Sequence, residues 1–327
     1  MRSNVMMALA VAMLAASVAA HAQYAPPVAV GKSEVGPDDE LGRLSWMTDA
    51  SRSAAMAKAT GKVYDLATDY FIGMPSFNGL GDPPYQYWLT HTPRGNVVDD
   101  PGKVGTAQNE KVSYTGDAVS FYTHMGTHID ALNHFGLHGK IWNGFDADTH
   151  LGDRGWKKTG AETIPPIVAR GVLIDVAAAR GVAMLEPLHR VTATDLKAAL
   201  ALQSTTIQRG DVVLVRTGRM ALFDKADAFT KDPPGLSPDG AAFLADAGAM
   251  IVGADNLSLE TFPSQVDGDW VPVHTYLLAH KGILIVEMAV LDALAKDQVY
   301  SFAFVGGSLK FRGASAAPIR PIAIAYR

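Results

Sequence analysis

Four short apolar segments in the second half of the chain constrain its fold more than any other feature. They are Val172–Val176, Asp211–Arg216, Ala249–Ala254 and Ile283–Val286. Each segment is bounded by polar or turn-forming residues and is rich in aliphatic side chains, which is typical of a strand buried on both faces. Helix signals separate the segments, so we expect an α/β fold in which covering helices pack on a mixed or parallel sheet.

The helix signals are caps, first-turn prolines and terminal glycines. They are Thr192 or Thr194 before an apolar stretch to Leu200, Ser237-Pro238 before a helix to about Asp246, and Pro272–His280 followed by Gly282. In open α/β sheets, functional sites gather at the carboxyl ends of the strands. Three polar residues follow the predicted strands there, namely Arg216, Asp255 and Glu287.

Composition excludes several classes of protein. The chain has 327 residues, no cysteine and a formal net charge of −5. Without cysteine it contains no disulfide, no thiolate zinc site and no cysteine nucleophile. The acidic balance argues against a nucleic-acid partner, whose binding surface is usually basic. No repeat or low-complexity linker divides residues 35–327, so we expect a single domain.

Residues 1–22 have the pattern of a secretory signal peptide. Arg2 precedes the apolar run Val5–Ala20, and Ala20-His21-Ala22 matches the small-x-small cleavage site. We therefore expect a mature domain of residues 23–327, periplasmic or secreted, with no membrane span after cleavage. An uncleaved anchor is the alternative, although a run of about 16 residues is marginal for a span that needs roughly 20.

Five of the ten histidines lie between residues 124 and 150. A regular helix would not place His124, His128 and Asp130 on one face, and a strand would spread them over about 20 Å. A single metal binds its ligands at roughly 2.1 Å, so the chain must bend, and Gly126 permits the bend. Imidazole and carboxylate suit Zn, Mn or Fe. The alternative is a hydrogen-bonded core cluster.

Three further residues have the chemistry of a site. His134 is predicted to be another ligand or a general base, because imidazole titrates near neutral pH. Glu287 lies between two apolar stretches, where a charge must be paired or metal-bound. His274 begins the preceding helix, which could return Glu287 close to it. The alternatives are an ion pair of Glu287 with Arg216 or Arg312, and a helix-start hydrogen bond for His274.

The string from His124 to Asp130, followed by His134-Phe135, resembles the signature of the metal-dependent cyclase family, which includes bacterial kynurenine formamidases and isatin hydrolases. Other segments resemble the longer, secreted members of that family. They are Gly36–Gly42, Asp65-Leu66, Gly73–Pro75, Gly210–Gly218 and Pro318–Ala323. The resemblance covers about residues 35–327.

The resemblance implies a swivelling β/β/α domain, one or two divalent metals (Zn or Mn) per subunit, and a homo-oligomer. It assigns roles to seven residues: first-metal ligands His124, His128 and Asp130; second-metal residues His274 and Glu287, together with Asp130; the general acid/base His134; and Phe77 in place of a substrate-stacking tryptophan. The separation of His274 and Glu287 is one residue longer than in the kynurenine formamidases. The aromatic segment around Tyr85, Tyr87 and Trp88 is expected to line the pocket or to pack in the core.

The function that the resemblance implies is hydrolysis of a carbon–nitrogen amide bond in a small molecule, either an aryl formamide or a cyclic amide. A bound metal lowers the pKa of water toward roughly 7 and stabilises the oxyanion. His134 then moves the proton to the leaving nitrogen. Lactone or imide hydrolysis and a dehydrating cyclase are alternatives on the same site, and a non-catalytic periplasmic binding protein is a third.

Overall fold

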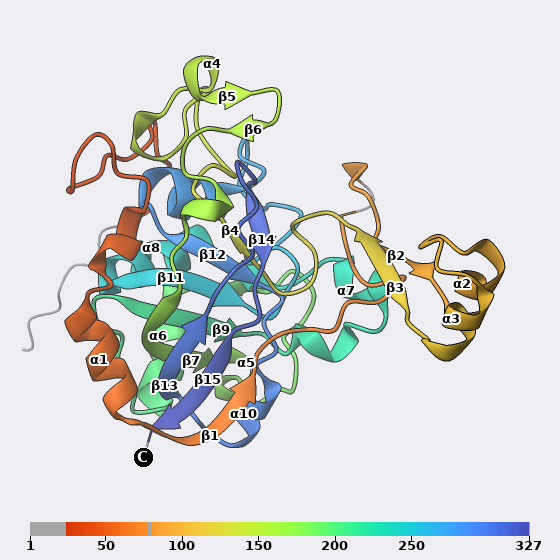
Figure 1. Ribbon diagram of the computed structural model, residues 1–327. Helices are drawn as coiled ribbons and strands as arrows, with labels where there is room; N and C mark the ends of the chain where they lie inside the picture. Colours follow the sequence, from red (N-terminus) through yellow and green to blue (C-terminus); the bar gives the residue numbers. More distant parts are fainter. Residues whose placement is uncertain (1–23, 78–79, 327) are drawn as a thin grey trace, which may run out of the picture.

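The computed structural model describes residues 24–77 and 80–326, so the predicted signal peptide lies outside the described residues (Figure 1). Nine strands form the main sheet: β1 (Ala59–Asp65), β4 (His128–Asp130), β7 (Ile167–Asp175), β9 (Asp211–Arg216), β11 (Ala249–Ala254), β12 (Leu284–Glu287), β13 (Ser301–Gly306), β14 (Ala316–Pro318) and β15 (Ile322–Tyr326). Their order across the sheet is β1-β15-β13-β7-β9-β11-β12-β4-β14. The sheet is mixed, because β7, β9, β11 and β12 run parallel while the flanking pairs are antiparallel.

Helices and short two-stranded sheets surround the main sheet. The helices are α1 (Asp49–Ala57), α2 (Pro93–Asp99), α3 (Thr106–Lys111), α4 (Ala147–His150), α5 (Val176–Ala179), α6 (Ala193–Leu202), α7 (Ala226–Thr230), α8 (Pro238–Ala247), α9 (Pro272–His274) and α10 (Asp292–Lys296), with shorter turns η1 (Gly42–Trp46), η3 (Trp142–Gly144), η4 (Ala161–Thr163) and η5 (Arg219–Leu222) and the π-helix η6 (Thr275–His280). The small sheets pair β2 (Gln86–His91) with β3 (Gly116–Ser120), β5 (Leu151–Gly152) with β6 (Gly155–Trp156), and β8 (Arg190–Val191) with β10 (Gly235–Leu236). Helices α6 and α8 pack on each other and against β7 and β11. None of the helices in the described ranges is long and apolar enough to cross a bilayer.

The four apolar segments form the parallel centre of the sheet, as predicted. Strands β9 and β11 coincide with the predicted bounds, and their residues Val213 and Ile251 are fully buried. Strand β7 begins earlier than predicted, at Ile167, because it also pairs antiparallel with β13 along its first half. The α/β prediction is therefore confirmed in the part of the chain that positions the site.

The cap signals are also borne out. Thr192, rather than Thr194, caps α6, and its side chain forms a reciprocal capping box with Asp195. Ser237 caps α8, whose first turn contains Pro238. The predicted helix 272–280 is not uniform, because three residues of α-helix pass into the π-helix η6 at Thr275.

Two of the three residues expected at strand ends serve the fold instead of a site. Arg216 binds Asp292 at 2.7 Å and Asp175 at 3.1 Å. Asp255 is fully buried and accepts hydrogen bonds from the amides of Thr217 and Gly218 and from the Thr217 hydroxyl. Burial raises the pKa of Asp255 to about 6 although these donors oppose the shift. Only Glu287 reaches the predicted centre.

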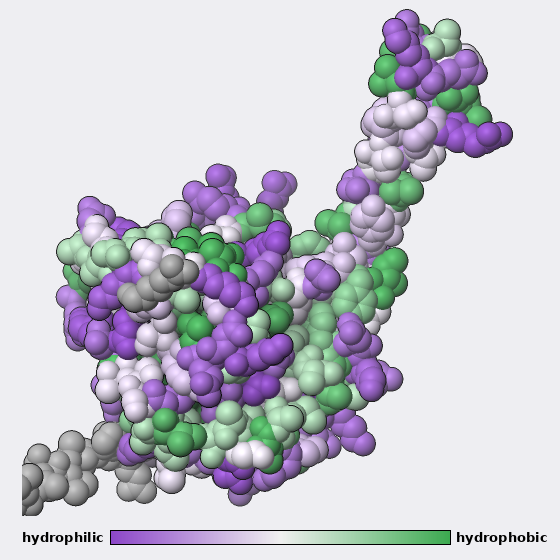
Figure 2. Space-filling model, turned by 90° about the horizontal axis from the view of Figure 1, so that it is seen from below, coloured by the Kyte–Doolittle hydropathy of each residue, from purple (hydrophilic) through white to green (hydrophobic). Residues whose placement is uncertain are grey.

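A narrow arm projects from the body of the molecule (Figures 1 and 2). It consists of the β2–β3 ribbon with α2 and α3 at its far end. Tyr87 and Trp88 are exposed on the ribbon, whereas Tyr85 packs at its base beside Phe121. The aromatic segment therefore divides between the surface and a satellite core.

Candidate metal centre

A sharp bend brings the histidine motif together. Gly126 adopts a φ of 60°, as its place in the motif predicted. The Tyr70 ring closes the outside of the bend, since a Cβ at position 126 would lie 2.6 Å from the ring carbon Cζ. The Tyr70 hydroxyl donates to the carbonyl of Met125 at 2.8 Å. After the bend, His128 and Asp130 alternate along β4 and so point to the same face of the sheet.

The bend places three candidate ligands around one point. Nδ1 of His124 lies 2.8 Å from Oδ1 of Asp130, and Nε2 of His128 lies 3.4 Å from the same oxygen. One nitrogen or oxygen from each of the three side chains lies within 4.8 Å of the others. All three are buried, with exposed fractions of 3% or less. The geometry therefore suits a common ion, which the spacing predicted.

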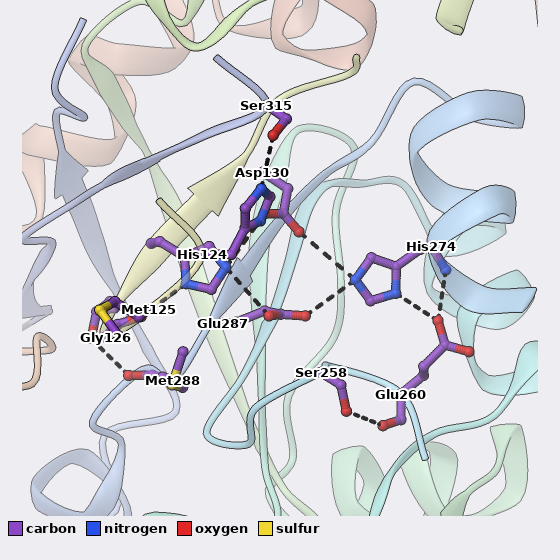
Figure 3. A network of polar contacts seen from close by, with 12 residues as sticks. His124, Met125, Gly126, Asp130, Ser258, Glu260, His274, Glu287, Met288 and Ser315 are labelled. Atoms are coloured by element: carbon purple, nitrogen blue, oxygen red, sulfur yellow. Dashed lines mark hydrogen bonds and ion pairs between the residues drawn. The ribbon is translucent and has the colours of Figure 1, made fainter. Parts of the chain in front are cut away.

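Glu287 and His274 face the same centre (Figure 3). Strand β12 pairs antiparallel with β4 so that Glu287 lies opposite His128, and Glu287 Oε2 approaches His128 Nε2 to 3.3 Å. Nε2 of His274 lies 3.2 Å from Glu287 Oε1 and 3.8 Å from Asp130 Oδ2. Glu287 contacts these histidines rather than Arg216 or Arg312, which were its alternative partners.

Three atoms at the centre lack hydrogen bonds. Nε2 of His128, Oδ2 of Asp130 and Oε1 of Glu287 are buried, and none has a hydrogen-bond partner of acceptable geometry within residues 24–77 and 80–326. Buried polar atoms without partners are costly and rare. Imidazole nitrogens and carboxylate oxygens are the donors that Zn²⁺ and Mn²⁺ accept, so these residues fit a divalent cation.

The electrostatics of the cluster favour a cation as well. Burial lowers the pKa of His128, but the carboxylates of Asp130 and Glu287, 3.4 and 3.3 Å from its Nε2, outweigh burial and raise the pKa to about 10. Burial raises the pKa of Asp130, and the nearby His134 and His124 outweigh it, so that the pKa falls well below its ordinary value. The two carboxylates thus hold positive charge strongly in this buried space.

His134 lies beside the cluster and has the opposite character. Its ring centroid is 3.9 Å from that of His124 and 6.0 Å from that of His274. Burial lowers the pKa of His134 well below its ordinary value, and the neighbouring imidazoles His124 and His274 add to this effect. His134 is therefore a neutral base at neutral pH. A ring nitrogen of His134 also lies within 4.8 Å of a carboxylate oxygen of Asp130 and of a ring nitrogen of His274, so His134 could share a metal ion with them.

The structure adds two residues that the sequence analysis missed. Glu260 accepts hydrogen bonds from Nδ1 of His274 at 2.6 Å and from the backbone amides of His274 and Val273. This contact directs Nε2 of His274 toward the centre, as carboxylates behind metal-binding histidines do. Glu260 follows Leu257 and Leu259, and a carboxylate beside apolar residues is a sequence signal that could have marked it. Ser315, 2.9 Å from His124 Nε2, had no comparable signal.

A cavity of about 160 Å³ opens onto the cluster. Phe77, Phe135 and Trp270 contribute aromatic walls, while His134, His274 and Glu287 lie at the polar end. Phe77 packs edge-on against Phe262, with ring centroids 6.0 Å apart. The cavity thus combines an apolar wall with the predicted ligands, and Phe77 lies where a substrate contact was predicted.

Comparison with known proteins adds a family to this geometry. The sequence model of the family described as "Putative cyclase" matches residues 64–261, which is more than half of the chain. The chain belongs to the cyclase family. It is 28% identical over 273 residues to cyclase-like protein 3 of Oryza sativa subsp. japonica, covering 82% of each chain. It is 25% identical over 255 residues to a kynurenine formamidase of Bacillus cereus, covering 77% of this chain and 94% of that one.

Solved structures of the cyclase family confirm the fold. A crystal structure described as a novel cyclase superposes with a TM-score of 0.79 at 26% identity, covering 90% of this chain and 99% of that one. Isatin hydrolase A from Ralstonia solanacearum superposes with a TM-score of 0.61 at 21% identity, covering 85% and 97%. The predicted single α/β domain of the cyclase type, with a mixed sheet and covering helices, is confirmed.

Proposed function

We propose that this cyclase-family chain is a divalent-metal-dependent hydrolase that cleaves a carbon–nitrogen amide bond in an aryl formamide or a cyclic amide. The observation that carries the proposal is the buried convergence of His128 Nε2, Asp130 Oδ2 and Glu287 Oε1, without hydrogen bonds, beneath an aromatic cavity. The names of the relatives, kynurenine formamidase and isatin hydrolase, support this class of reaction.

The chain would hold Zn²⁺ or Mn²⁺ with residues from both sides of the centre. His124, His128 and Asp130 are the proposed ligands of one ion, and Asp130, His274 and Glu287 offer donors to a second. When bound, such an ion lowers the pKa of a water ligand and polarises a carbonyl oxygen. Asp130 lies between the two ligand groups, so it would serve either one ion or two.

His134 would carry the proton. Because burial and its imidazole neighbours hold its pKa low, the ring is neutral at neutral pH and its free nitrogen can accept a proton from water. The same ring then delivers the proton to the departing nitrogen, which would otherwise leave as a poor anionic group. Phe77, Phe135 and Trp270 would contact the aryl ring and exclude bulk water from the reacting bond.

The test is hydrolysis of an aryl formamide and of isatin, followed by absorbance and product mass. Chelation should abolish turnover, and added Zn²⁺ or Mn²⁺ should restore it. The variant His134→Ala should keep its metal content and lose roughly 10²- to 10⁴-fold in rate. His91→Ala is the matched control, because His91 stacks on Tyr114 in the arm. Full turnover of demonstrably metal-free protein, or cleavage of lactones alone, would contradict the proposal.

We also propose that residues 1–22 are removed on export to the periplasm and that the mature chain forms a homo-oligomer. The mass of the exported protein and its sedimentation in solution test these two points. An intact N-terminus or a monomer would contradict them.

A further inference from the structure

A second hollow, of about 440 Å³, also reaches the centre. His134 lines both this hollow and the aromatic cavity. Ser315 lines the hollow as well, and its hydroxyl contacts Nε2 of His124 at 2.9 Å. Two residues of the hollow therefore touch or form part of the candidate metal centre, and of its lining the proposed function uses His134 alone.

The two cavities differ in charge. The aromatic cavity is lined by three carboxylates, from Asp82, Glu260 and Glu287. The hollow is lined by Arg154 and Arg312, and no described residue in its lining is acidic. The side chains of the hollow therefore attract an anion by themselves, whereas the aromatic cavity would attract one only through the positive charge of a bound metal.

Both arginines are free to bind a ligand. Neither Arg154 nor Arg312 forms a salt bridge or a hydrogen bond with any residue of the described ranges 24–77 and 80–326. Five other arginines of those ranges have carboxylate partners, namely Arg52, Arg170, Arg180, Arg216 and Arg320. Two unpaired guanidinium groups on one hollow provide forked donors that match a carboxylate.

Close backbone packing fixes the rim that carries these arginines. The amide of Trp156 donates to the carbonyl of Gly313 at 3.1 Å. A Cβ at Gly155 would lie 2.7 Å from that carbonyl oxygen, so only glycine permits the approach. Arg154 and Arg312 each precede one of these glycines, and the contact therefore holds the two arginines on one rim.

A buried amide supplies a further polar group. Asn133 is only 2% exposed and lines the hollow. Its Nδ2 donates to the carbonyl of Ala314 at 3.4 Å, while its Oδ1 is buried without a partner among the described residues. An acceptor left open beside two free donors suits a ligand that carries an anionic group and an N–H or O–H donor, or an anion with an attendant water.

We propose that this hollow is the binding and exit site for the carboxylate that amide hydrolysis releases. In that reaction the oxygen of water bonds to the carbonyl carbon and the carbon–nitrogen bond breaks. One proton of the water goes to the departing nitrogen, and the other is released as the acid ionises to a carboxylate. The carboxylate is formate when a formamide is cleaved and an aryl carboxylate when a cyclic amide is opened. The ligand class rests on the proposed function, whereas the anion site itself rests on Arg154, Arg312 and Asn133.

The experiment is a saturation-transfer NMR titration of metal-loaded protein with formate and, separately, with benzoate. The double variant Arg154→Gln/Arg312→Gln should raise the Kd of the carboxylate that the site binds, formate or benzoate, roughly three- to tenfold. The change is modest because each exposed ion pair contributes little to the binding free energy. The arm with the larger change identifies whether formate or an aryl carboxylate is the ligand. Arg180→Gln removes the same charge from the remote pair with Asp195 and should leave both Kd values unchanged.

Unchanged Kd values for both carboxylates in the double variant would overturn the site, since a carboxylate bound elsewhere, including on the metal, does not need these arginines. The titration requires no turnover, so the two proposals fail separately. Arginine-dependent binding by a protein that cleaves no amide would refute the proposed function alone. Amide cleavage with arginine-independent binding would refute the exit site alone.

Discussion

Glu260 should set the metal affinity of the centre although it touches no metal position directly. Its carboxylate receives three hydrogen bonds, one from Nδ1 of His274 and two from backbone amides at the start of α9. In the variant Glu260→Gln one acceptor oxygen remains and the other becomes an amide nitrogen, which cannot accept. The charge behind the imidazole is lost as well.

The expected magnitude follows from these contacts. A hydrogen bond to a charged group contributes about 1.5–3 kcal/mol, and each 1.4 kcal/mol is roughly a tenfold change in a binding constant. Losing the charged contact to His274 should therefore weaken metal binding about 10- to 100-fold, which matches the usual effect of removing a carboxylate behind a metal-binding histidine. The loss should appear in metal affinity more than in substrate KM.

Competition with a chromophoric chelator measures this affinity. Glu186→Gln is a close control, because Glu186 also contacts Nδ1 of a histidine, His189 at 3.2 Å, but does so at the surface. The control should bind metal as the wild type does. Wild-type affinity in Glu260→Gln would refute the reasoning, because it would mean that His274 needs no carboxylate behind it.

Three further outcomes are expected. Gly126→Ala should destabilise the fold by about 1–3 kcal/mol more than Gly139→Ala in chemical unfolding. Both glycines have a positive φ, but only a Cβ at position 126 would meet the Tyr70 ring. Equal losses of stability would show that the Tyr70 ring causes no steric clash. In metal-free protein the raised pKa of His128 contributes stability that is fully present below about pH 6.5 and is lost as the pH rises through about 10. Unfolding temperatures should therefore fall across that pH range, and bound Zn²⁺ should flatten the change. A metal-free protein whose unfolding temperature does not change over that range would contradict this. Asp255→Ala should cost about 2–4 kcal/mol of stability, because the buried donors of Thr217 and Gly218 would lose their acceptor. The folded variant should retain the metal affinity of the wild type. A loss of metal affinity would indicate that Asp255 belongs to the metal centre.

The sequence predicted the parallel centre of the sheet well because its signals are local. Apolar runs and caps such as Ser237 act within a few residues, and the structure places β9, β11 and α8 close to their predicted bounds. The antiparallel flank was less accessible, since the pairing of β7 with β13 joins segments about 130 residues apart, and no local pattern specifies such a partner.

The candidate centre divides in the same way. His124, His128 and Asp130 lie within one motif, and the bend at Gly126 followed from the reach of a metal ion. Ser315 contacts His124 of the motif from a distant loop, where no local pattern marks its side chain. Glu260 contacts His274 instead, and only its charge beside apolar residues could have marked it. Arg216 and Asp255 were expected at the site because of their strand ends, but neighbouring charges and amides satisfy them first.

The π-helix η6 lies between two of the candidate metal ligands, His274 and Glu287. Each hydrogen bond of a π-helix spans five residues instead of four, so a π-turn holds one residue more than an α-turn. A turn of this kind lets the chain carry an additional residue between His274 and Glu287 without moving either end. Glu287 lies opposite His128 in the sheet. A shift of its strand by one position would turn the carboxylate to the other face, so the wider turn preserves the strand register on which the centre depends.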